Sequence, residues 1–445
     1  MHIEMPSGVK YIIEQLKNGG YEAYAVGGCV RDSILGRNPN DWDITTSAKP
    51  EDVKSIFRRT IDTGIQHGTV TVMLKDEAFE ITTYRIDGEY SDHRRPDGVT
   101  FTSELSEDLL RRDFTINAMA YNDEDGLVDL YGGLQDLDNK IIRCVGDPDE
   151  RFDEDALRIM RAVRFAAQLG FEIDSETKAA AAGHAKELKE VSAERIETEL
   201  TKLITSDHPE KIMEMYELGI TAVILPEFDE MVMTEQNSPY HLYDVGRHTV
   251  EVMKNTSPTK VMRYTALLHD SGKVDKKTTD EAGVDHFKGH AFVSEKKARV
   301  ILKRLRMDND TIRDVSTLCL WHDFGINGAS KKAVRRMLSQ MGPQYFDQLV
   351  EIKKADMLGQ SDYLLEDRQQ RFDQLVQYHE EIVRDKDPLS IAELEINGKD
   401  LIDMGIKPGP KMGEILQELL DSVLENPSMN KKETLIEYVS KRLKE

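Results

Sequence analysis

The chain has 445 residues, of which 39% are hydrophobic and 32% charged, and its formal net charge is −23. This length supplies roughly two to four domains with hydrophobic cores. The strong negative charge excludes broad, charge-driven binding to a polyanion, so a nucleic-acid contact would need local basic surface or bound metal ions. Two basic runs could supply that surface, although each alone is most simply a solvated helix face: Arg299, Lys303, Arg304 and Arg306, then Lys331, Lys332, Arg335 and Arg336.

The cysteines and the hydropathy pattern bear on the compartment. Cys29, Cys144 and Cys319 are far apart and form no CxxC pair, so neither a disulfide framework nor a zinc ribbon is indicated. Residues 1–10 contain no apolar core of signal-peptide length, and no later stretch approaches about 18 uncharged apolar residues. We therefore expect a cytoplasmic protein that does not interact with a membrane.

The first third of the chain mixes short strand and helix signals. Strand-like stretches separated by Gly and Asp turns occur at 21–28, 42–46, 68–74, 79–85 and 127–133. From Asp153 onward strand signals nearly vanish, and apolar residues recur at helical spacing, for example over 154–171 and 192–204. The pattern predicts an α+β fold in which an N-terminal mixed domain is followed by mostly helical structure.

Breaks in the helical pattern divide the remainder of the chain. Pro226 with the polar stretch 234–239 marks one boundary, and the segment 385–390 marks another. A tight connection between two helices is predicted near the end by Gly405, Pro408, Gly409 and Pro410. We expect four segments: a head at 1–145, a helical neck at 146–230, a third domain at 231–385 and a helical tail at 386–445.

A pair of carboxylates in the head carries the first chemical signal. Asp41 and Asp43 lie two residues apart in a predicted strand, so both side chains share one face. Two Mg²⁺ ions would relieve their repulsion, one activating an attacking hydroxyl group and the other stabilising a departing pyrophosphate. Glu80, in the strand 79–85, can lie beside them as a third carboxylate. Taken alone, such a pair is most simply explained as a solvated strand end. The neighbouring residues therefore determine whether it indicates a metal site.

Those surroundings contain glycines and arginines. Gly27 and Gly28 precede Arg31, and a turn without side chains followed by an arginine suits close approach to a triphosphate. A second cluster can hold phosphate and a ribose hydroxyl, or can simply tie a loop to a helix: Arg111, Arg112, Asp113 and Asn117. Together with the carboxylates, these residues predict metal-dependent nucleotidyl transfer.

A predicted helix that contains Glu154 carries three arginines at i+3 spacing, Arg158, Arg161 and Arg164. Their mutual repulsion costs a few tenths of a kcal/mol per pair, by the rule for like charges on a helix, and an anionic ligand would remove it. Asp155 and Arg158 can also read a base edge, accepting from an exocyclic amino group and donating to a ring nitrogen. That edge belongs to cytosine and adenine rather than guanine and uracil. The alternative is an ordinary surface ion pair.

In order and spacing, GGCVRD–DWD, RRDFTINA, VDLYGG and EDALRIMRAVRF resemble the motifs of class II CCA-adding enzymes and bacterial poly(A) polymerases. The resemblance covers residues 20–225. It implies a polymerase-β-like catalytic sheet, Mg²⁺ bound by Asp41 and Asp43, base selection by Asp155 and Arg158, and a helical body and tail that hold tRNA. It also implies nucleotide contacts from Arg31, Arg112, Arg161 and Arg164 beside Gly28, with Arg195 supporting the site.

The implied activity is template-independent addition of CCA to tRNA from CTP and ATP. A poly(A) polymerase is one alternative, but residues 57–72 do not match the GRRF-type element of those enzymes. Enzymes that add only CC lack an intact flexible loop, whereas the segment 87–102 is present here and contains Asp92, Arg94 and Arg95. A further alternative is a phosphohydrolase or RNA-binding protein with a vestigial head, against which the intact carboxylate pair argues.

Histidines are concentrated in the third segment. Six of the 12 lie between His241 and His322. Their pattern over 240–360 resembles that of the HD family of phosphohydrolases, which implies a divalent-metal site. His286 is not included among the implied ligands. Imidazole and carboxylate ligands suit Mn, Fe, Ni, Zn or Mg, so the metal identity is open. The implied ligands are a basic set and an extension for a second metal: His248, His269, Asp270 and Asp356, then His290 and His322.

Overall fold

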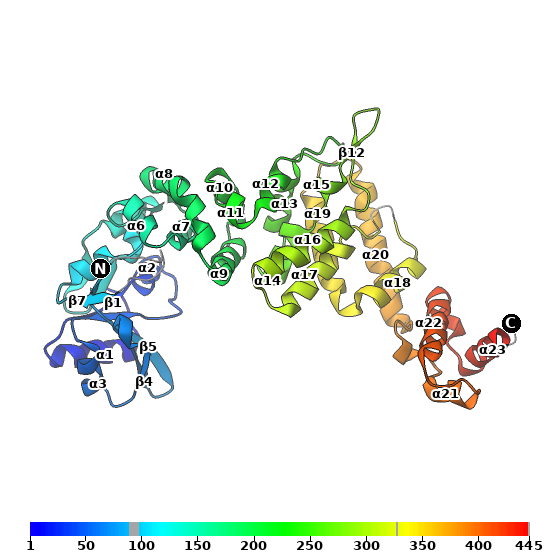
Figure 1. The fold of residues 1–445 in the computed structure, drawn as a ribbon, viewed down its shortest axis with the longest axis horizontal. Helices are drawn as coiled ribbons and strands as arrows, with labels where there is room; N and C mark the ends of the chain where they lie inside the picture. The colour runs from blue at the N-terminus through cyan, green and yellow to red at the C-terminus, as the bar shows by residue number, and fades with distance from the viewer. Residues whose placement is uncertain (89–97, 326–327, 444–445) are drawn as a thin grey trace. The chain divides into compact units, whose positions relative to one another are not determined.

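The computed structural model describes residues 1–88, 98–325 and 328–443 (Figure 1). The chain divides into two compact units, Met1–Asp229 and Glu230–Glu445. The first unit contains the main sheet of the described chain, and the second is almost entirely helical. The predicted α+β class is therefore confirmed. Within the described ranges, no helix has the length and apolar character needed to cross a membrane.

A seven-stranded mixed sheet, of order β3-β4-β5-β2-β1-β8-β9, forms the centre of the head. Its strands are β1 (Ala23–Val26), β2 (Ile44–Thr46), β3 (Thr60–Gly64), β4 (Thr69–Leu74), β5 (Glu77–Thr83), β8 (Met119–Asn122) and β9 (Gly126–Asp129). β2 and β5 run parallel, with Ile44 opposite Ile81, and the other neighbours are antiparallel. All four residues of β1 are buried, because this strand lies inside the sheet and α1 (Ser7–Asn18) packs on it.

Short helices connect the strands of the head and lead into the neck. In the head these are α2 (Gly28–Ile34), α3 (Pro50–Ile56), α4 (Leu105–Leu110) and α5 (Gly133–Asn139). The neck contains α6 (Pro148–Glu154), α7 (Leu157–Leu169), α8 (Ser175–His184), α9 (Ala193–Ile204) and α10 (Ile212–Glu217). α7 buries most of its length and packs against α9, as its apolar periodicity predicts.

The predicted continuous helix through Glu154 is wrong at one residue. Asp155 has extended backbone angles, φ −148° and ψ 100°, and separates α6 from α7. Its carboxylate accepts a hydrogen bond from the Leu157 backbone N–H at 3.1 Å, which satisfies a free donor at the start of α7. Aspartate favours such a capping position over a helix interior, and this preference outweighs the apolar spacing.

The second unit is a helical array followed by the tail (Figure 1). Its longer helices are α13 (Val245–Lys254), α14 (Lys260–Leu268), α16 (His290–Arg304), α17 (Asn309–Trp321), α18 (Lys331–Met341), α19 (Phe346–Leu358), α20 (Leu365–Asp385), α22 (Pro410–Glu425) and α23 (Lys432–Arg442). In the tail, α21 (Gly398–Asp403) ends before the Gly/Pro segment and α22 begins at Pro410, as that segment predicts. Arg335 of α18 donates to the carbonyl of Leu424 at 2.7 Å and to that of Glu425 at 3.1 Å, so it satisfies the end of α22.

Candidate active site and candidate metal centre

Three carboxylates line one cleft of the head. Asp41 and Asp43 lie in the extended segment directly before β2 rather than in the predicted strand itself. Both are exposed, with Trp42 half-buried between them, so the expected alternation still holds. Because Ile44 pairs with Ile81, Asp43 and Glu80 occupy neighbouring positions on the face opposite these buried residues. The cleft that contains all three has a volume of about 910 Å³.

The electrostatics of this cleft favour a cation. Desolvation by the surrounding protein raises the pKa of Asp43 above its ordinary value, Asp41 adds to this rise, and Arg112 opposes it. A raised pKa means that the ionised carboxylate is disfavoured in this position. A divalent cation between the carboxylates would remove that penalty, and oxygen ligands of this kind suit Mg²⁺.

The glycine turn brings an arginine close to the backbone. β1 ends at Val26, and Gly27 adopts φ +81°, a left-handed conformation that favours glycine. A Cβ atom at this position would lie 3.0 Å from Nη1 of Arg112, so a side chain would crowd the guanidinium. Nε of Arg112 is buried and has no hydrogen-bond partner among the described residues. The guanidinium of Arg112 next to this turn thus keeps at least one N–H donor for a ligand.

One aromatic ring joins α2 to α7. The guanidinium carbons of Arg31, Arg161 and Arg164 lie 5.0, 5.4 and 3.6 Å from the centre of the Phe165 ring. Arg31 also donates to Oδ1 of Asn117 at 2.6 Å. A ring face attracts cations, so Phe165 stabilises several positive charges in one place. Phe165 is the last residue of the EDALRIMRAVRF motif and directly follows Arg164, but the motif assigned it no role of its own.

Each arginine of the ridge has a carboxylate partner inside the protein. Arg158 is paired with Glu154. Arg161 donates through Nε to Asp113 at 2.8 Å, and Arg164 to Glu199 at 2.7 Å. These pairs already offset the mutual repulsion of the three arginines within the protein. Arg164 is buried, whereas the Arg161 side chain remains one-third exposed.

Asp155 and Arg158 are held by different partners. Oδ2 of Asp155 accepts from Nη2 of Arg195 at 2.7 Å. Arg158 donates through Nη2 to the carbonyl of Arg111 at 3.2 Å and through Nη1 to the carbonyl of Arg151 at 3.1 Å. These hydrogen bonds fix the Asp155 carboxylate and the Arg158 guanidinium in position. The loop residues Asp92, Arg94 and Arg95 lie outside the described residues.

The predicted basic runs are largely engaged within the protein. On α16, Arg299 is paired with Glu295. On α18, all four basic residues contact carboxylates: Lys331 with Glu381 and Asp385, Lys332 and Arg336 with Glu425, and Arg335 with Asp387. Arg335 is buried, so it holds the tail in place rather than presenting a free charge.

The second unit brings the six predicted metal-ligand residues together. They come from five places: α13 (His248), the end of α14 (His269 and Asp270), the start of α16 (His290), the end of α17 (His322) and α19 (Asp356). His248, His269 and Asp356 form one group whose ligand atoms lie within 4.8 Å of one another, and His269, Asp270 and His322 form another. Nε2 of His290 lies 3.2 Å from Oδ1 of Asp270 and 3.1 Å from Nε2 of His322. His286 pairs with Asp280 outside this cluster.

Backbone carbonyls orient all four imidazoles. Nδ1 lies 3.1 Å from the Gly359 carbonyl in His248 and 2.7 Å from the Ala266 carbonyl in His269. In His290 and His322 the corresponding distances, to Phe287 and Cys319, are 2.9 and 2.8 Å. A proton on each Nδ1 leaves each Nε2 as a lone pair facing the carboxylates. Nε2 of His269 is buried without a hydrogen-bond partner among the described residues, and it lies 3.3 Å from Oδ2 of Asp270, so this donor set fits a metal ion.

Two further residues border the cluster. Nζ of Lys273 lies 2.6 Å from Oδ2 of Asp270 and donates to Gln236 at 2.7 Å. Burial alone would raise the pKa of Asp270, but His269 and Lys273 hold it well below its ordinary value. The His241 ring lies 5.4 Å from that of His248, and desolvation lowers the pKa of His241 to about 3. The sequence analysis did not predict that Lys273 borders this cluster, although its position three residues after Asp270 is typical of an ion pair.

Comparisons with known proteins agree along the chain. Three family models match: "Poly A polymerase head domain" at 23–143, "Probable RNA and SrmB- binding site of polymerase A" at 170–232, and a tRNA nucleotidyltransferase domain 2 at 282–439. The CCA-adding enzyme of Levilactobacillus brevis is 36% identical over 432 residues, 96% of each chain. That of Lactiplantibacillus plantarum is 36% identical over 437 residues, 96% of this chain and 94% of the relative.

A solved structure extends the agreement to the fold. The CCA-adding enzyme of Bacillus stearothermophilus, in complex with CTP, is similar with a TM-score of 0.73 and 30% identity. The similarity covers 99% of this chain and 100% of that one. The head sheet, the carboxylate cleft and these full-length relatives lead to one conclusion: the chain belongs to the family of CCA-adding enzymes.

Proposed function

We propose that this protein adds the 3′-terminal C, C and A to tRNA from CTP and ATP and releases pyrophosphate. The observation that carries the proposal is that Asp41, Asp43 and Glu80 line one cleft of a chain that matches CCA-adding enzymes from end to end. A poly(A) polymerase, the alternative, would use ATP alone and continue past one A. The full-length similarity favours CCA addition, and the assembled carboxylates argue against a vestigial head.

Asp41 and Asp43, with Glu80 beside them, would hold Mg²⁺, which supplies activation of the tRNA 3′-hydroxyl and stabilisation of the pyrophosphate. The Gly27–Gly28 turn lets the triphosphate approach the backbone. Arg112 faces that turn, and its unpartnered Nε suits a phosphate oxygen. Arg31, fixed by Asn117, contributes a second positive charge.

Base selection falls to Asp155 and Arg158 in this proposal. Asp155 accepts from the amino group of cytosine or adenine, and Arg158 donates to the adjacent ring nitrogen. Their supports, Arg195 behind Asp155 and the carbonyls behind Arg158, keep the two groups in place. Arg161 has exposed surface for a nucleotide contact, whereas the buried Arg164 acts through the Phe165 ring and Glu199.

The division of labour along the chain follows the four predicted segments. The head at 1–145 carries the chemistry, and the neck at 146–230 carries base selection. The domain at 231–385 and the tail at 386–445 hold the tRNA. The test is incubation with tRNA that lacks CCA, with CTP and ATP separately and together, and analysis of product length. We expect CTP alone to extend the tRNA by two nucleotides, and a third nucleotide to be added only when ATP is also present. A long tail made with ATP alone would overturn the proposal.

A second function is favoured by the convergence of four imidazole Nε2 atoms on Asp270 and Asp356. We propose that these residues hold one or two divalent metal ions, and that this HD-type centre hydrolyses phosphoesters. The bound metal supplies a water of lowered pKa for attack on phosphorus. The chain's own contribution is to fix each imidazole through a backbone carbonyl. Elemental analysis and hydrolysis of a model phosphodiester with Mn²⁺, Ni²⁺, Co²⁺ or Mg²⁺ supplied test it.

A further inference from the structure

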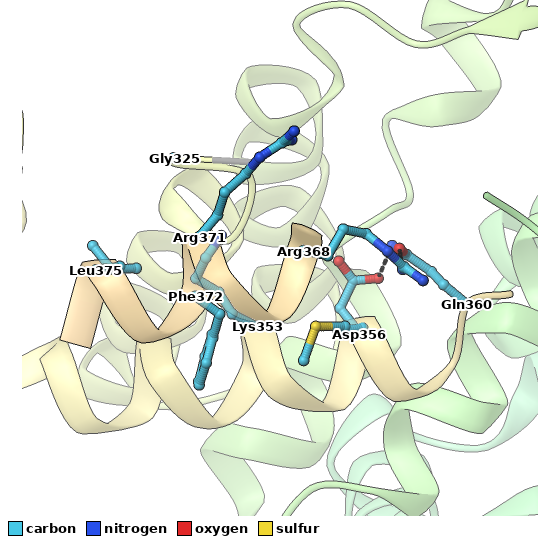
Figure 2. A pocket seen from close by; sticks show the side chains of 9 residues that line it. Gly325, Lys353, Asp356, Gln360, Arg368, Arg371, Phe372 and Leu375 are labelled. Carbon is cyan, nitrogen blue, oxygen red and sulfur yellow. Dashed lines mark hydrogen bonds between the residues drawn. The ribbon is translucent and has the colours of Figure 1, made fainter. Parts of the chain in front are cut away.

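A cavity opens beside Asp356, on the side formed by α19 and α20 (Figure 2). Its volume is about 60 Å³, which is room for several water-sized groups. Three of the residues that line it carry positive side chains: Lys353, Arg368 and Arg371. Asp356 is the carboxylate among the lining residues, and in the proposed function it is a metal ligand. Once a cation neutralises Asp356, the remaining charge of the lining is positive.

Gln360 connects Arg368 to Asp356, and Figure 2 shows the three side chains next to one another. Nε2 of Gln360 donates to Oδ1 of Asp356 at 3.0 Å, and Oε1 of Gln360 accepts from Nη1 of Arg368. The amide can face both partners only in this orientation, since its NH₂ group must meet the carboxylate and its oxygen the guanidinium. Gln360 therefore sets the position of Arg368 relative to the metal centre.

Arg368 is held tightly but is not saturated. Its Nη2 donates to the carbonyl of Ser361, and Nη1 is engaged by Gln360. Nε is buried and lacks a hydrogen-bond partner among the residues that the structure describes. A buried N–H without a partner is unfavourable, and a phosphate oxygen would satisfy it. The arginine is thus fixed in direction, and its Nε–H is among the donors left for a ligand.

Lys353 supplies a second cation from the opposite helix. Its Nζ donates to the carbonyl of His322 at 2.9 Å, so it sits directly behind one of the proposed metal ligands. Its ammonium group and the Arg368 guanidinium both line the cavity, and two positive groups there favour an anion. Without a bound cation, however, Asp356 would repel the same anion.

We propose that this cavity is the phosphoryl-binding subsite of the metal centre, in which Arg368, set by Gln360 and assisted by Lys353, binds the phosphate group of the substrate. The proposal rests on the proposed phosphohydrolase function. It assigns the substrate class, a phosphate ester that presents two or more free oxygens to a guanidinium. It also predicts that phosphate binding and metal binding strengthen each other, because the metal removes the repulsion from Asp356.

The test uses the full-length chain and inorganic phosphate as the probe. Calorimetry gives the phosphate affinity with and without Mn²⁺, and elemental analysis gives the bound metal, for the wild type, Arg368→Ala and Arg368→Lys. The matched control is Arg384→Ala, an exposed arginine of the same helix that pairs with its neighbour Asp385. We expect about a tenfold loss of phosphate affinity in Arg368→Ala, partial recovery in Arg368→Lys, and unchanged metal content. The head is identical in all variants, so lost binding belongs to this cavity.

Each outcome separates the two proposals. Full metal content with a phosphate affinity that Arg368→Ala leaves unchanged overturns the subsite and keeps the metal centre. A raised KM with unchanged kcat for a phosphomonoester supports a binding role for Arg368, whereas a fall in kcat alone contradicts it. A wild-type chain that holds no metal removes the second function and with it the substrate role of the cavity. Phosphate affinity that does not respond to Mn²⁺ contradicts the predicted coupling.

Discussion

Nη2 of Arg195, on α9, donates to Oδ2 of Asp155 over 2.7 Å, across 40 positions of sequence. Asp155 also caps α7 through the Leu157 N–H, so its carboxylate has two supports and a fixed direction. If Asp155 reads the base, then the hydrogen bond from Arg195 holds its carboxylate in the orientation that base reading requires. This contact agrees with the supporting role that the family resemblance implies for Arg195, and it connects that role to the base selection proposed for Asp155.

The first prediction concerns this support. Arg195→Ala leaves the Asp155 carboxylate free to turn, and should lower the preference for CTP over UTP by about tenfold, the size of one lost charged hydrogen bond. Overall triphosphate affinity should change less, since Arg31 and Arg112 are untouched. The measurement is the ratio of kcat/KM for the two nucleotides. Lys202→Ala, an exposed residue of the same helix, is the control. An unchanged ratio with a slower rate would argue against base reading by Asp155.

The second prediction concerns the carboxylate cleft. Asp43→Ala should reduce nucleotide incorporation by about a thousandfold or more, because Mg²⁺ loses a ligand. The thermal midpoint should hardly move, since the Asp43 side chain is exposed and its raised pKa marks a disfavoured charge. Asp76→Asn, an exposed acid in the turn between β4 and β5, should behave as wild type. A folded Asp43→Ala protein that adds CMP at the normal rate would falsify the assignment.

The head could be predicted well because its signals are local. The alternation of Asp41, Trp42 and Asp43 survives even though β2 begins one residue later, and the strand around Glu80 suggested its place beside them. The residues proposed as metal ligands were identified because histidines are concentrated between His241 and His322 and their pattern resembles that of HD-family phosphohydrolases. In both cases the residue types themselves carried the information.

The remaining features depend on contacts between distant segments. The break at Asp155 was missed because apolar spacing continues through it, while the capping bond and Arg195 decide the backbone. Nothing in the sequence brings Arg31 of α2 to the ring of Phe165 on α7. Arg368 likewise reads as a solvated residue of a polar helix, and only the fold places it against Gln360 and Asp356.

The third prediction tests the shared ring. Phe165→Leu keeps an apolar side chain but removes the face over which three guanidiniums lie, and should cost about 2 kcal/mol of stability, as expected for loss of cation–π contacts and a small cavity. The KM for CTP should rise, because Arg31 loses its support. Phe152→Leu, a buried phenylalanine of α6 whose ring neighbour is His184, is the control. It should lower the thermal midpoint without changing the KM.

The fourth prediction separates the two proposed sites. Asp270→Ala removes the carboxylate that lies 3.2 Å from Nε2 of His290 and 3.5 Å from Nε2 of His248, so bound divalent metal and phosphodiester hydrolysis should both be lost. Addition of CCA should remain largely intact, because no catalytic group of the head is altered. Asp41→Ala should have the reverse effect, with full metal content in the second unit and no nucleotide incorporation.

The Asp270 variant also leaves Lys273 without its partner, since Nζ lies 2.6 Å from the lost carboxylate. A buried ammonium group without a counter-charge is destabilising, so loss of activity in this variant alone could reflect local unfolding. Asp356→Asn keeps the shape of the side chain and removes only the charge, and it does not touch Lys273. If Asp356→Asn loses metal and hydrolysis at an unchanged thermal midpoint, the metal centre is responsible. If it retains both, Asp356 is not a ligand, and the cavity beside it has no part in hydrolysis.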